Sequence, residues 1–267
     1  MTDMNIRHRP RKRFGQNFLS DRNIVAKIIQ ALGAGPQDHV IEIGPGQGVL
    51  TGELLASAAS VNAIEIDRDL VSMLQQKFAV MDSFTIHESD VLKTDFNTLL
   101  SAQNPVRIIG NLPYNISTPL LFHLLAYLHG IKDMLFMLQL EVVDRLVASP
   151  GTKNYGRLSI MLQYFCQIEK LFTVPPGAFS PPPKVHSAIV RLIPKTSDQL
   201  VLQNPVTLEK LVRQAFSHRR KTLRNNLKGL LSDEELSALN IDPGLRPENL
   251  SLEDYVRIST HLEDKDG

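Results

Sequence analysis

The chain has 267 residues, which is enough for one large α/β domain and a smaller second one. Hydrophobic residues make up 43% of the chain, and no long uncharged apolar run is present, so no membrane-spanning helix is predicted. Cys166 is the single cysteine and has no His or Cys cluster beside it, so we expect neither a disulfide framework nor a metal site. We expect a cytoplasmic protein.

The net charge of +1 conceals two basic segments. Residues 1–13 hold five Lys or Arg, and residues 211–232 hold six with no acid between them. No apolar run follows the first segment, so it is not predicted to be a secretory signal. Two basic segments on an acidic body favour a polyanion bound at defined places, whereas the alternative for the second segment is a solvated helix face. The candidate RNA contacts are Arg219, Arg220, Lys221 and Arg224.

Residues 11–19 show no periodicity and predict an arm ahead of the first helix. Ser20 is the expected N-cap of that helix. The amide of Asn17 and the rings of Phe14 and Phe18 can close over a ligand. From spacing alone, we prefer the interpretation that the two rings only attach the arm to the body.

A glycine-rich turn follows the first long strand. Residues 39–43 predict a short apolar strand, and Gly44-Pro45-Gly46-Gln47-Gly48 comes before a helix. Such a turn lets a ligand approach the backbone closely. The spacing is G-x-G-x-G rather than the dinucleotide pattern G-x-G-x-x-G, which weakens a nicotinamide interpretation without excluding it.

Acidic residues follow the next two predicted strands. Glu65 ends one strand, 21 residues after Gly44, where a carboxylate can accept hydrogen bonds from both hydroxyls of a ribose. Asp67 competes for that role, and we prefer Glu65 because it stands at the strand end. Asp90 follows the third strand and can accept a proton of an adenine amino group.

The segment from residue 106 to 114 predicts a buried strand and a polar turn. Ligands of open α/β sheets bind beyond the carboxyl ends of the strands. The side-chain oxygen of Asn111 and the backbone carbonyl of Leu112 can accept both N–H bonds of a nucleobase amine, which points its lone pair at an electrophile. Pro113 removes a competing donor and Tyr114 offers a ring for stacking. The alternative is an ordinary turn at a strand end.

The next helix is expected to start at Ser117 or Thr118, with Pro119 at its first position. Farther along, residues 174–184 hold five prolines around Phe179. A proline-rich connection usually means rigidity alone, but an aromatic inside it is a candidate second stacking surface opposite Tyr114.

A polar stretch at residues 194–203 predicts a domain boundary. We therefore expect one domain over residues 1–195, including an arm at 1–19, and an all-helical RNA-binding domain over 196–267. The basic cluster is expected within a helical segment at residues 217–230.

Taken together, these motifs resemble the ribosomal RNA adenine N6,N6-dimethyltransferases of the KsgA type. The matching segments, in family order from about Lys12 onward, are GQNFL, EIGPGQG, IEID, SDVL, GNLPY, YGRLS, PPGAFSPPPKV and RRKTLRNNL. The resemblance implies a Rossmann-like class I methyltransferase with a mostly parallel seven-stranded sheet, a small helical C-terminal domain, and S-adenosylmethionine as cofactor. The implied cofactor site is Asn17, Leu19, Gly44, Glu65, Asp90 and Asn111.

By the same resemblance, the turn from Asn111 to Tyr114 is catalytic and Phe179 faces the target base. The implied reaction places two methyl groups on each of two adjacent adenosines near the 3′ end of 16S ribosomal RNA, within an immature 30S particle. A monomer without a metal, with a role in small-subunit biogenesis, is expected.

Three alternatives remain at this point. The macrolide-resistance methyltransferases of large-subunit RNA are disfavoured because GNLPY and FSPPPKVHS are more similar to the KsgA type. DNA adenine methyltransferases usually carry two prolines where Leu112 and Pro113 stand here. A non-catalytic RNA-binding assembly factor has no need of Glu65 and Asp90.

Overall fold

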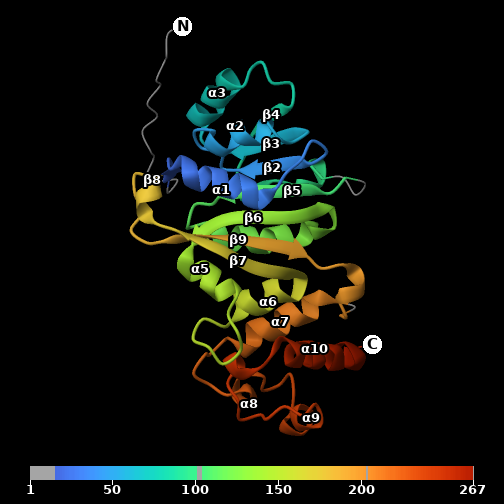
Figure 1. The fold of residues 1–267 in the computed structure, drawn as a ribbon. Coiled ribbons are helices and arrows are strands. Elements are labelled where there is room, and N and C mark those ends of the chain that lie inside the picture. Colours follow the sequence, from blue (N-terminus) through green and yellow to red (C-terminus); the bar gives the residue numbers. More distant parts are fainter. Residues whose placement is uncertain (1–15, 101–103, 203, 267) are drawn as a thin grey trace. The chain divides into compact units, whose positions relative to one another are not determined.

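The computed structural model describes residues 16–100, 104–202 and 204–266 (Figure 1). The basic segment 1–13 and Phe14 lie outside these residues. The chain divides into two compact units, one of residues 1–143 and 169–194, the other of residues 144–168 and 195–267. The second unit therefore includes an internal stretch, 144–168, that we expected in the first domain.

The first unit contains a seven-stranded sheet in the order β4-β3-β2-β5-β6-β9-β7 (Figure 1). The strands are β2 (His39–Ile43), β3 (Ser60–Glu65), β4 (Phe84–Glu88), β5 (Val106–Asn111), β6 (Ile131–Gln139), β7 (Cys166–Val174) and β9 (Ser187–Pro194). The five strands from β4 to β6 are parallel, and β9 runs antiparallel to β6. The predicted mostly parallel seven-stranded sheet is confirmed.

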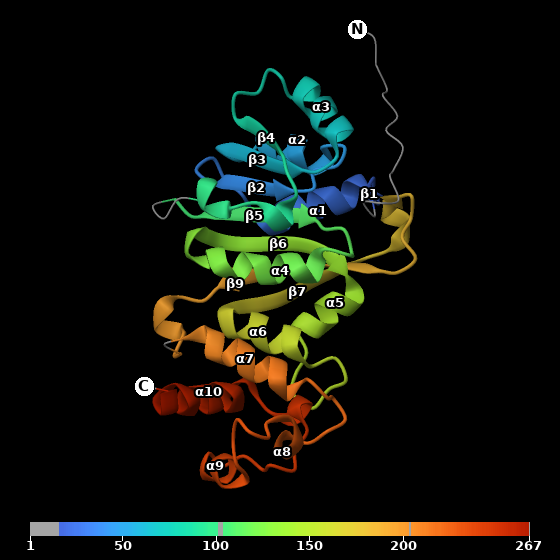
Figure 2. The same cartoon turned by 180° about the vertical axis from the view of Figure 1, so that it is seen from behind.

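Helices cover both faces of this sheet, with α1 on one face and α4 on the other (Figures 1 and 2). They are α1 (Arg22–Leu32), α2 (Val49–Leu55), α3 (Arg68–Lys77), α4 (Ser117–Leu124) and α5 (Leu140–Leu146), which crosses into the second unit. Strands β2 and β5 are buried on both faces, which explains their nearly continuous apolar sequence. No helix within the described ranges is both long and apolar enough to cross a bilayer.

Two helix starts differ from the prediction. Asp21, not Ser20, caps α1, because its carboxylate accepts two backbone N–H groups of the first turn. The Ser20 hydroxyl donates instead to the carbonyl of Ala178, 3.2 Å away. Helix α4 begins at Ser117, so Pro119 is its third residue. A proline is still tolerated there, because N–H groups of the first turn have no partner within the helix.

The second unit is mainly helical. Its helices are α6 (Arg157–Phe165), α7 (Pro205–Ala215), α8 (Leu223–Asn226), α9 (Asp233–Ala238) and α10 (Leu252–Asp266). Helix α10 packs against α7 and α6. The fully buried Tyr255 anchors α10, and its hydroxyl donates to the carbonyl of Pro247 at 2.8 Å. Capping boxes begin α9 at Ser232 and α10 at Ser251.

The basic cluster lies in a turn, so the helix predicted over residues 217–230 is wrong. Helix α7 ends at Ala215, and α8 is a single short turn. The side-chain amide of the buried Asn226 donates to the carbonyls of His218 (3.1 Å) and Lys221 (3.3 Å). Asparagine satisfies backbone groups in this way in place of helical hydrogen bonds.

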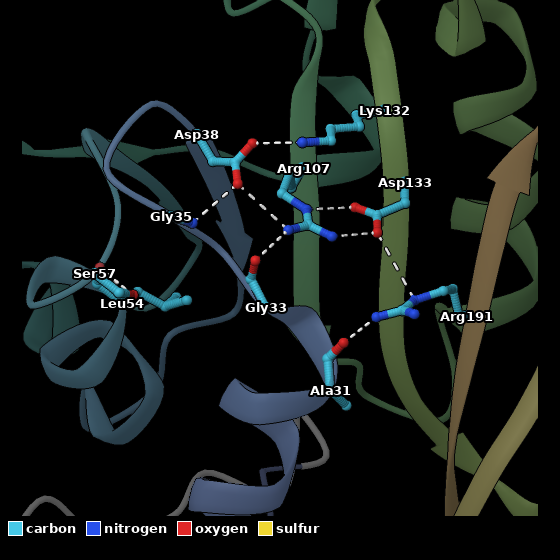
Figure 3. A network of polar contacts seen from close by, with 10 residues as sticks. All are labelled: Ala31, Gly33, Gly35, Asp38, Leu54, Ser57, Arg107, Lys132, Asp133 and Arg191. Carbon is cyan, nitrogen blue, oxygen red and sulfur yellow. Dashed lines mark hydrogen bonds and ion pairs between the residues drawn. The ribbon is translucent and has the colours of Figure 1, made fainter.

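A buried ion network joins the amino-terminal ends of the parallel strands (Figure 3). Arg107 on β5 makes a bidentate pair with Asp133 on β6, at 2.8 and 2.6 Å. Its third nitrogen donates to the carbonyl of Gly33 at the end of α1 (2.9 Å) and lies 3.4 Å from Asp38. These contacts raise the pKa of the Arg107 guanidinium. Arg191 on β9 approaches Asp133 to 3.8 Å. One network therefore connects β5, β6, β9 and the start of β2 to the end of α1.

We expect Asp133→Asn to lower the free energy of unfolding by about 3 kcal/mol or more, because it leaves the buried Arg107 cation without its bidentate partner. The control is Lys132→Met, which breaks only the pair with Asp38. The Lys132 side chain is 52% exposed, so the loss should stay below about 1 kcal/mol. Urea unfolding measures both variants, and equal losses would contradict the role given to Asp133.

Candidate active site at the strand ends

The carboxyl ends of β2, β3 and β5 open into a cavity of about 290 Å³ within the first unit. Parallel strands end at the same edge of the sheet, and β2 lies between β3 and β5, where the strand order changes direction. Nine of the ten predicted catalytic and cofactor residues line this cavity: Asn17, Gly44, Glu65, Asp90, Asn111, Leu112, Pro113, Tyr114 and Phe179.

Leu19 is the exception. Its side chain is buried in the hydrophobic core, and its backbone pairs with Phe179 in a two-stranded sheet of β1 (Phe18–Leu19) and β8 (Phe179–Ser180). Phe18 also lines the cavity, so its ring is placed where it could contact a ligand as well as attach the arm. Gln16 also lines it and was not predicted.

The glycine turn brings backbone to the cavity wall. Gly44 and Gly46 have φ values of 67° and 58°, a region that side-chain-bearing residues rarely adopt. A Cβ atom on Gly46 would come within 3.0 Å of the Phe18 ring. The turn therefore requires glycine here, and the absence of side chains leaves room for a ligand beside the backbone.

Of the two acids at the end of β3, Glu65 lines the cavity and Asp67 does not. One Glu65 oxygen accepts the N–H of Asp67 (3.0 Å) and the N–H of Ile66 (2.9 Å), and the other lies 3.3 Å from the Gly46 nitrogen. Burial raises the pKa of the Glu65 carboxyl. Asp67 is fully buried and caps α3, and it accepts a hydrogen bond from Gln16 at 3.1 Å.

Asp90 stands at the end of β4 and lines the same cavity. Its Oδ1 accepts the N–H of Leu92 at 3.0 Å, which orients the carboxylate at the start of a short 3-10 turn, Val91–Lys93. Ile66, 45% exposed, also lines the cavity and adds apolar surface near these acids. A polar rim with apolar walls suits a flat heterocycle that carries an amino group.

The orientation of the Asn111 amide is set by one contact. Its Nδ2 donates to the backbone carbonyl of Asn17 at 3.0 Å. A carbonyl only accepts hydrogen bonds, so the nitrogen must face Asn17 and the Oδ1 atom is turned to the other side. The following N–H, of Leu112, donates to the carbonyl of Met137 on β6 at 3.2 Å.

The turn is held at two further points. The Ser117 hydroxyl donates to the carbonyl of Tyr114, and the N–H of Ile116 donates to that of Pro113, both at 3.1 Å. The phenol oxygen of Tyr114 lies 3.1 Å from the hydroxyl of Ser187 at the start of β9. The turn therefore carries hydrogen bonds to strand β6, to helix α4 and to strand β9.

A buried carboxyl lies beneath the glycine turn and was not predicted. Glu42 on β2 is 1% exposed, and its Oε2 accepts a hydrogen bond from the Thr51 hydroxyl on α2 at 2.6 Å. Burial raises its pKa from 4.5 to about 7. Its signal in the sequence is an acid inside an otherwise apolar strand, HVIEI.

No group of three or more His, Cys, Asp or Glu side chains in the described ranges is arranged to hold a metal ion.

The raised pKa of the Glu42 carboxyl makes the stability of the protein depend on pH. The folded protein keeps the Glu42 proton up to about pH 7, whereas the unfolded chain loses it near 4.5. Stability should therefore fall as pH rises between these values. We expect Glu42→Gln to remove this dependence and to be more stable than wild type at pH 8 by roughly 3 kcal/mol. Urea unfolding from pH 4 to 8 tests this, with the exposed Glu53→Gln on α2 as control. A slope retained in Glu42→Gln would contradict it.

The sheet order, the glycine turn and the acids at successive strand ends define a class I methyltransferase fold. A family model described as ribosomal RNA adenine dimethylase matches residues 7–264. The chain belongs to this family, and it is therefore a methyltransferase. The resemblance inferred from the motifs is confirmed.

Similar proteins agree with this assignment. A protein of Saccharophagus degradans named ribosomal RNA small subunit methyltransferase A is 54% identical over 98% of this chain and 97% of its own length. A protein of the same name from Pseudomonas aeruginosa is 53% identical, with 97% of each chain covered. Among solved structures, a dimethyladenosine transferase from Plasmodium falciparum superimposes with a TM-score of 0.81 at 31% identity, covering 93% of this chain and 98% of the other.

The large-subunit alternative is less similar. The structure of the 23S rRNA methyltransferase ErmE superimposes with a TM-score of 0.72 at 26% identity, covering 92% of this chain and all of the other. The comparison favours the small-subunit relatives.

Proposed function

We propose that this protein transfers four methyl groups from S-adenosylmethionine to the N6 atoms of two adjacent adenosines near the 3′ end of 16S ribosomal RNA, within an immature 30S particle. The observation that carries the chemistry is the hydrogen bond from Asn111 to Asn17, which turns an amide oxygen away from the arm. The names of the relatives support the choice of the small subunit. In this proposal the protein acts in the cytoplasm in small-subunit biogenesis.

The residues around the cavity fit the proposed cofactor. Glu65 would accept the ribose hydroxyls, Asp90 the adenine amino group, and the backbone at Gly44 would lie against the amino-acid portion. The arm from Gln16 to Phe18 would cover the ligand. When bound, the cofactor supplies a methyl group made electrophilic by the sulfonium.

The turn orients the nucleophile in this proposal. The lone pair of the adenine N6 atom is delocalised into the ring. The amine is therefore a poor nucleophile as long as its two N–H bonds lie in the plane of the base. Asn111 Oδ1 and the Leu112 carbonyl accept its two N–H bonds, and the lone pair then points out of the plane. The gain is one of orientation, so no general base is required.

Two rings hold the target base in the proposed complex. Tyr114 and Phe179 both line the cavity, and Phe179 is held in β8 by its pairing with Leu19. A base must leave its stack to enter such a site, and contact with aromatic faces offsets part of that cost. Stacking on a ring face does not depend on the N6 hydrogens, so the same two faces can accept both the unmethylated and the methylated adenine.

The second unit contributes an exposed basic turn. Arg219, Arg220 and Lys221 are exposed, and Asn226 holds the backbone between them. Arg224 pairs with Asp233 at 2.6 Å, so part of its charge is already compensated. We propose that the first three residues contact RNA phosphates and that Arg224 contributes less than we expected from the sequence.

The direct test is to incubate the protein with labelled S-adenosylmethionine and small subunits from a strain that lacks this methylation, and then to map the product. Two adjacent dimethyladenosines near the 3′ end are expected. Label at other positions of the 16S RNA, or in no RNA, would refute the proposal.

We expect Asn111→Ala to slow methyl transfer by at least ~10²-fold, because the amine loses its positioned acceptor. The affinity for S-adenosylhomocysteine, measured by calorimetry, should change little. Asn97→Ala, at an exposed asparagine, is the control and should retain the wild-type rate. Wild-type turnover in Asn111→Ala would rule out the assigned role.

We expect neutralisation of Arg219, Arg220 and Lys221 to weaken binding to the particle and to flatten the dependence of log K on log salt concentration by up to ~2–3 units. A matched variant neutralises three exposed lysines elsewhere, Lys27, Lys170 and Lys210. Filter binding over a salt series measures both slopes. Equal slopes in the two triple variants would show that the cluster is solvated surface.

A further inference from the structure

We propose that Ser187 is a positioning residue that directs the ring of Tyr114 into the base-binding side of the cavity. The inference rests on the proposed function, in which the Tyr114 ring stacks on the target base. The observation behind it is the 3.1 Å contact between the Ser187 hydroxyl and the Tyr114 phenol oxygen.

Ser187 occupies a rigid place in the sheet. It is the first residue of β9, is 1% exposed, and pairs with Gln139 of β6. The backbone carbonyl of the residue before it, His186, accepts the N–H of Leu140 at 3.0 Å, which secures the entrance to the strand. A hydroxyl buried in this way needs a hydrogen-bond partner, and the Tyr114 phenol is the one the structure provides.

Tyr114 is thereby held both at its backbone and at the tip of its side chain. At the backbone end, its carbonyl accepts the Ser117 hydroxyl at 3.1 Å. At the far end, its oxygen meets Ser187. Because the phenol oxygen lies on the long axis of the ring, this contact determines where the axis points but does not block rotation about it. We infer that Ser187 selects the χ1 rotamer of Tyr114, and that the packed walls of the cavity set the plane of the ring.

The same segment of chain also places the second ring. Phe179 is in β8, and residues 181–186 lead directly from β8 to Ser187. The Ser187 contact therefore connects the Tyr114 turn to the segment that carries Phe179. The spacing between the two proposed stacking rings depends on this short connection and on the hydrogen bond between the Ser187 and Tyr114 hydroxyls.

A double-mutant cycle tests the inference. We expect Ser187→Ala and Tyr114→Phe each to lower the single-turnover methyl-transfer rate by ~3–10-fold, the range for one neutral hydrogen bond. The double variant should be no slower than either single variant, because both remove the same contact. Affinity for S-adenosylhomocysteine should stay within ~2-fold of wild type. Losses that multiply in the double variant would overturn the inference.

Tyr114→Phe alone protects the test against a folding defect in Ser187→Ala, because it removes one half-buried oxygen and keeps the ring. A wild-type rate in Tyr114→Phe would overturn the proposal by itself. Thermal unfolding of each variant identifies any loss that arises from stability.

A second readout needs no methyl transfer. The chain has five tyrosines, and in protein labelled with 3-fluorotyrosine the Tyr114 resonance is the one that disappears in Tyr114→Phe. We expect Ser187→Ala to shift or broaden this resonance while the other four stay in place. An unchanged resonance would refute the positioning role. If wild-type protein transferred no methyl group, the proposed function would fail, while the fluorine spectrum would still decide whether Ser187 holds the ring.

Discussion

One hydrogen bond, from the Asn111 amide to the Asn17 carbonyl, is the constraint on which the site depends. It joins two segments that are far apart in the chain, and it decides which atom of the amide faces the ligand. If the amide were reversed, its oxygen would meet another oxygen and its donor would face the amine, which needs an acceptor. In the proposed mechanism, the backbone carbonyl of Asn17 is therefore part of the catalytic geometry.

The sheet supplies the rest of the arrangement. Adjacent parallel strands must finish at one edge, so the turn after β2 and the ends of β3 and β5 meet whatever sequence lies between them. The ion pair of Arg107 and Asp133 at the opposite edge aligns β5 and β6 at their starts. One edge is therefore occupied by stabilising contacts, which leaves the other edge open for chemistry.

Sequence reasoning correctly brought residues together at one cavity where their location follows from their position along a strand. Gly44, Glu65, Asp90 and Asn111 stand at strand ends, and local patterns reveal strand ends. It failed where a contact joins distant segments. Leu19 lies in the core because β1 pairs with β8, and no pattern in the neighbouring sequence predicts that pairing. For Asn226, the carbonyls that its amide satisfies lie five and eight residues back, a spacing that no helical or strand period predicts.

The second unit is assembled from two separate stretches of chain, 144–168 and 195–267. Helix α6 belongs to the first stretch, yet it packs on α7 and α10 of the second. A fragment beginning at residue 195 would therefore expose the surface that α6 covers, and a truncation at that point would leave α6 without its neighbours. The second unit is consequently not a tail that can be excised or transplanted by a single cut. Exchanging it between homologues would take two crossover points, and chimaeras made with only one should be poorly soluble.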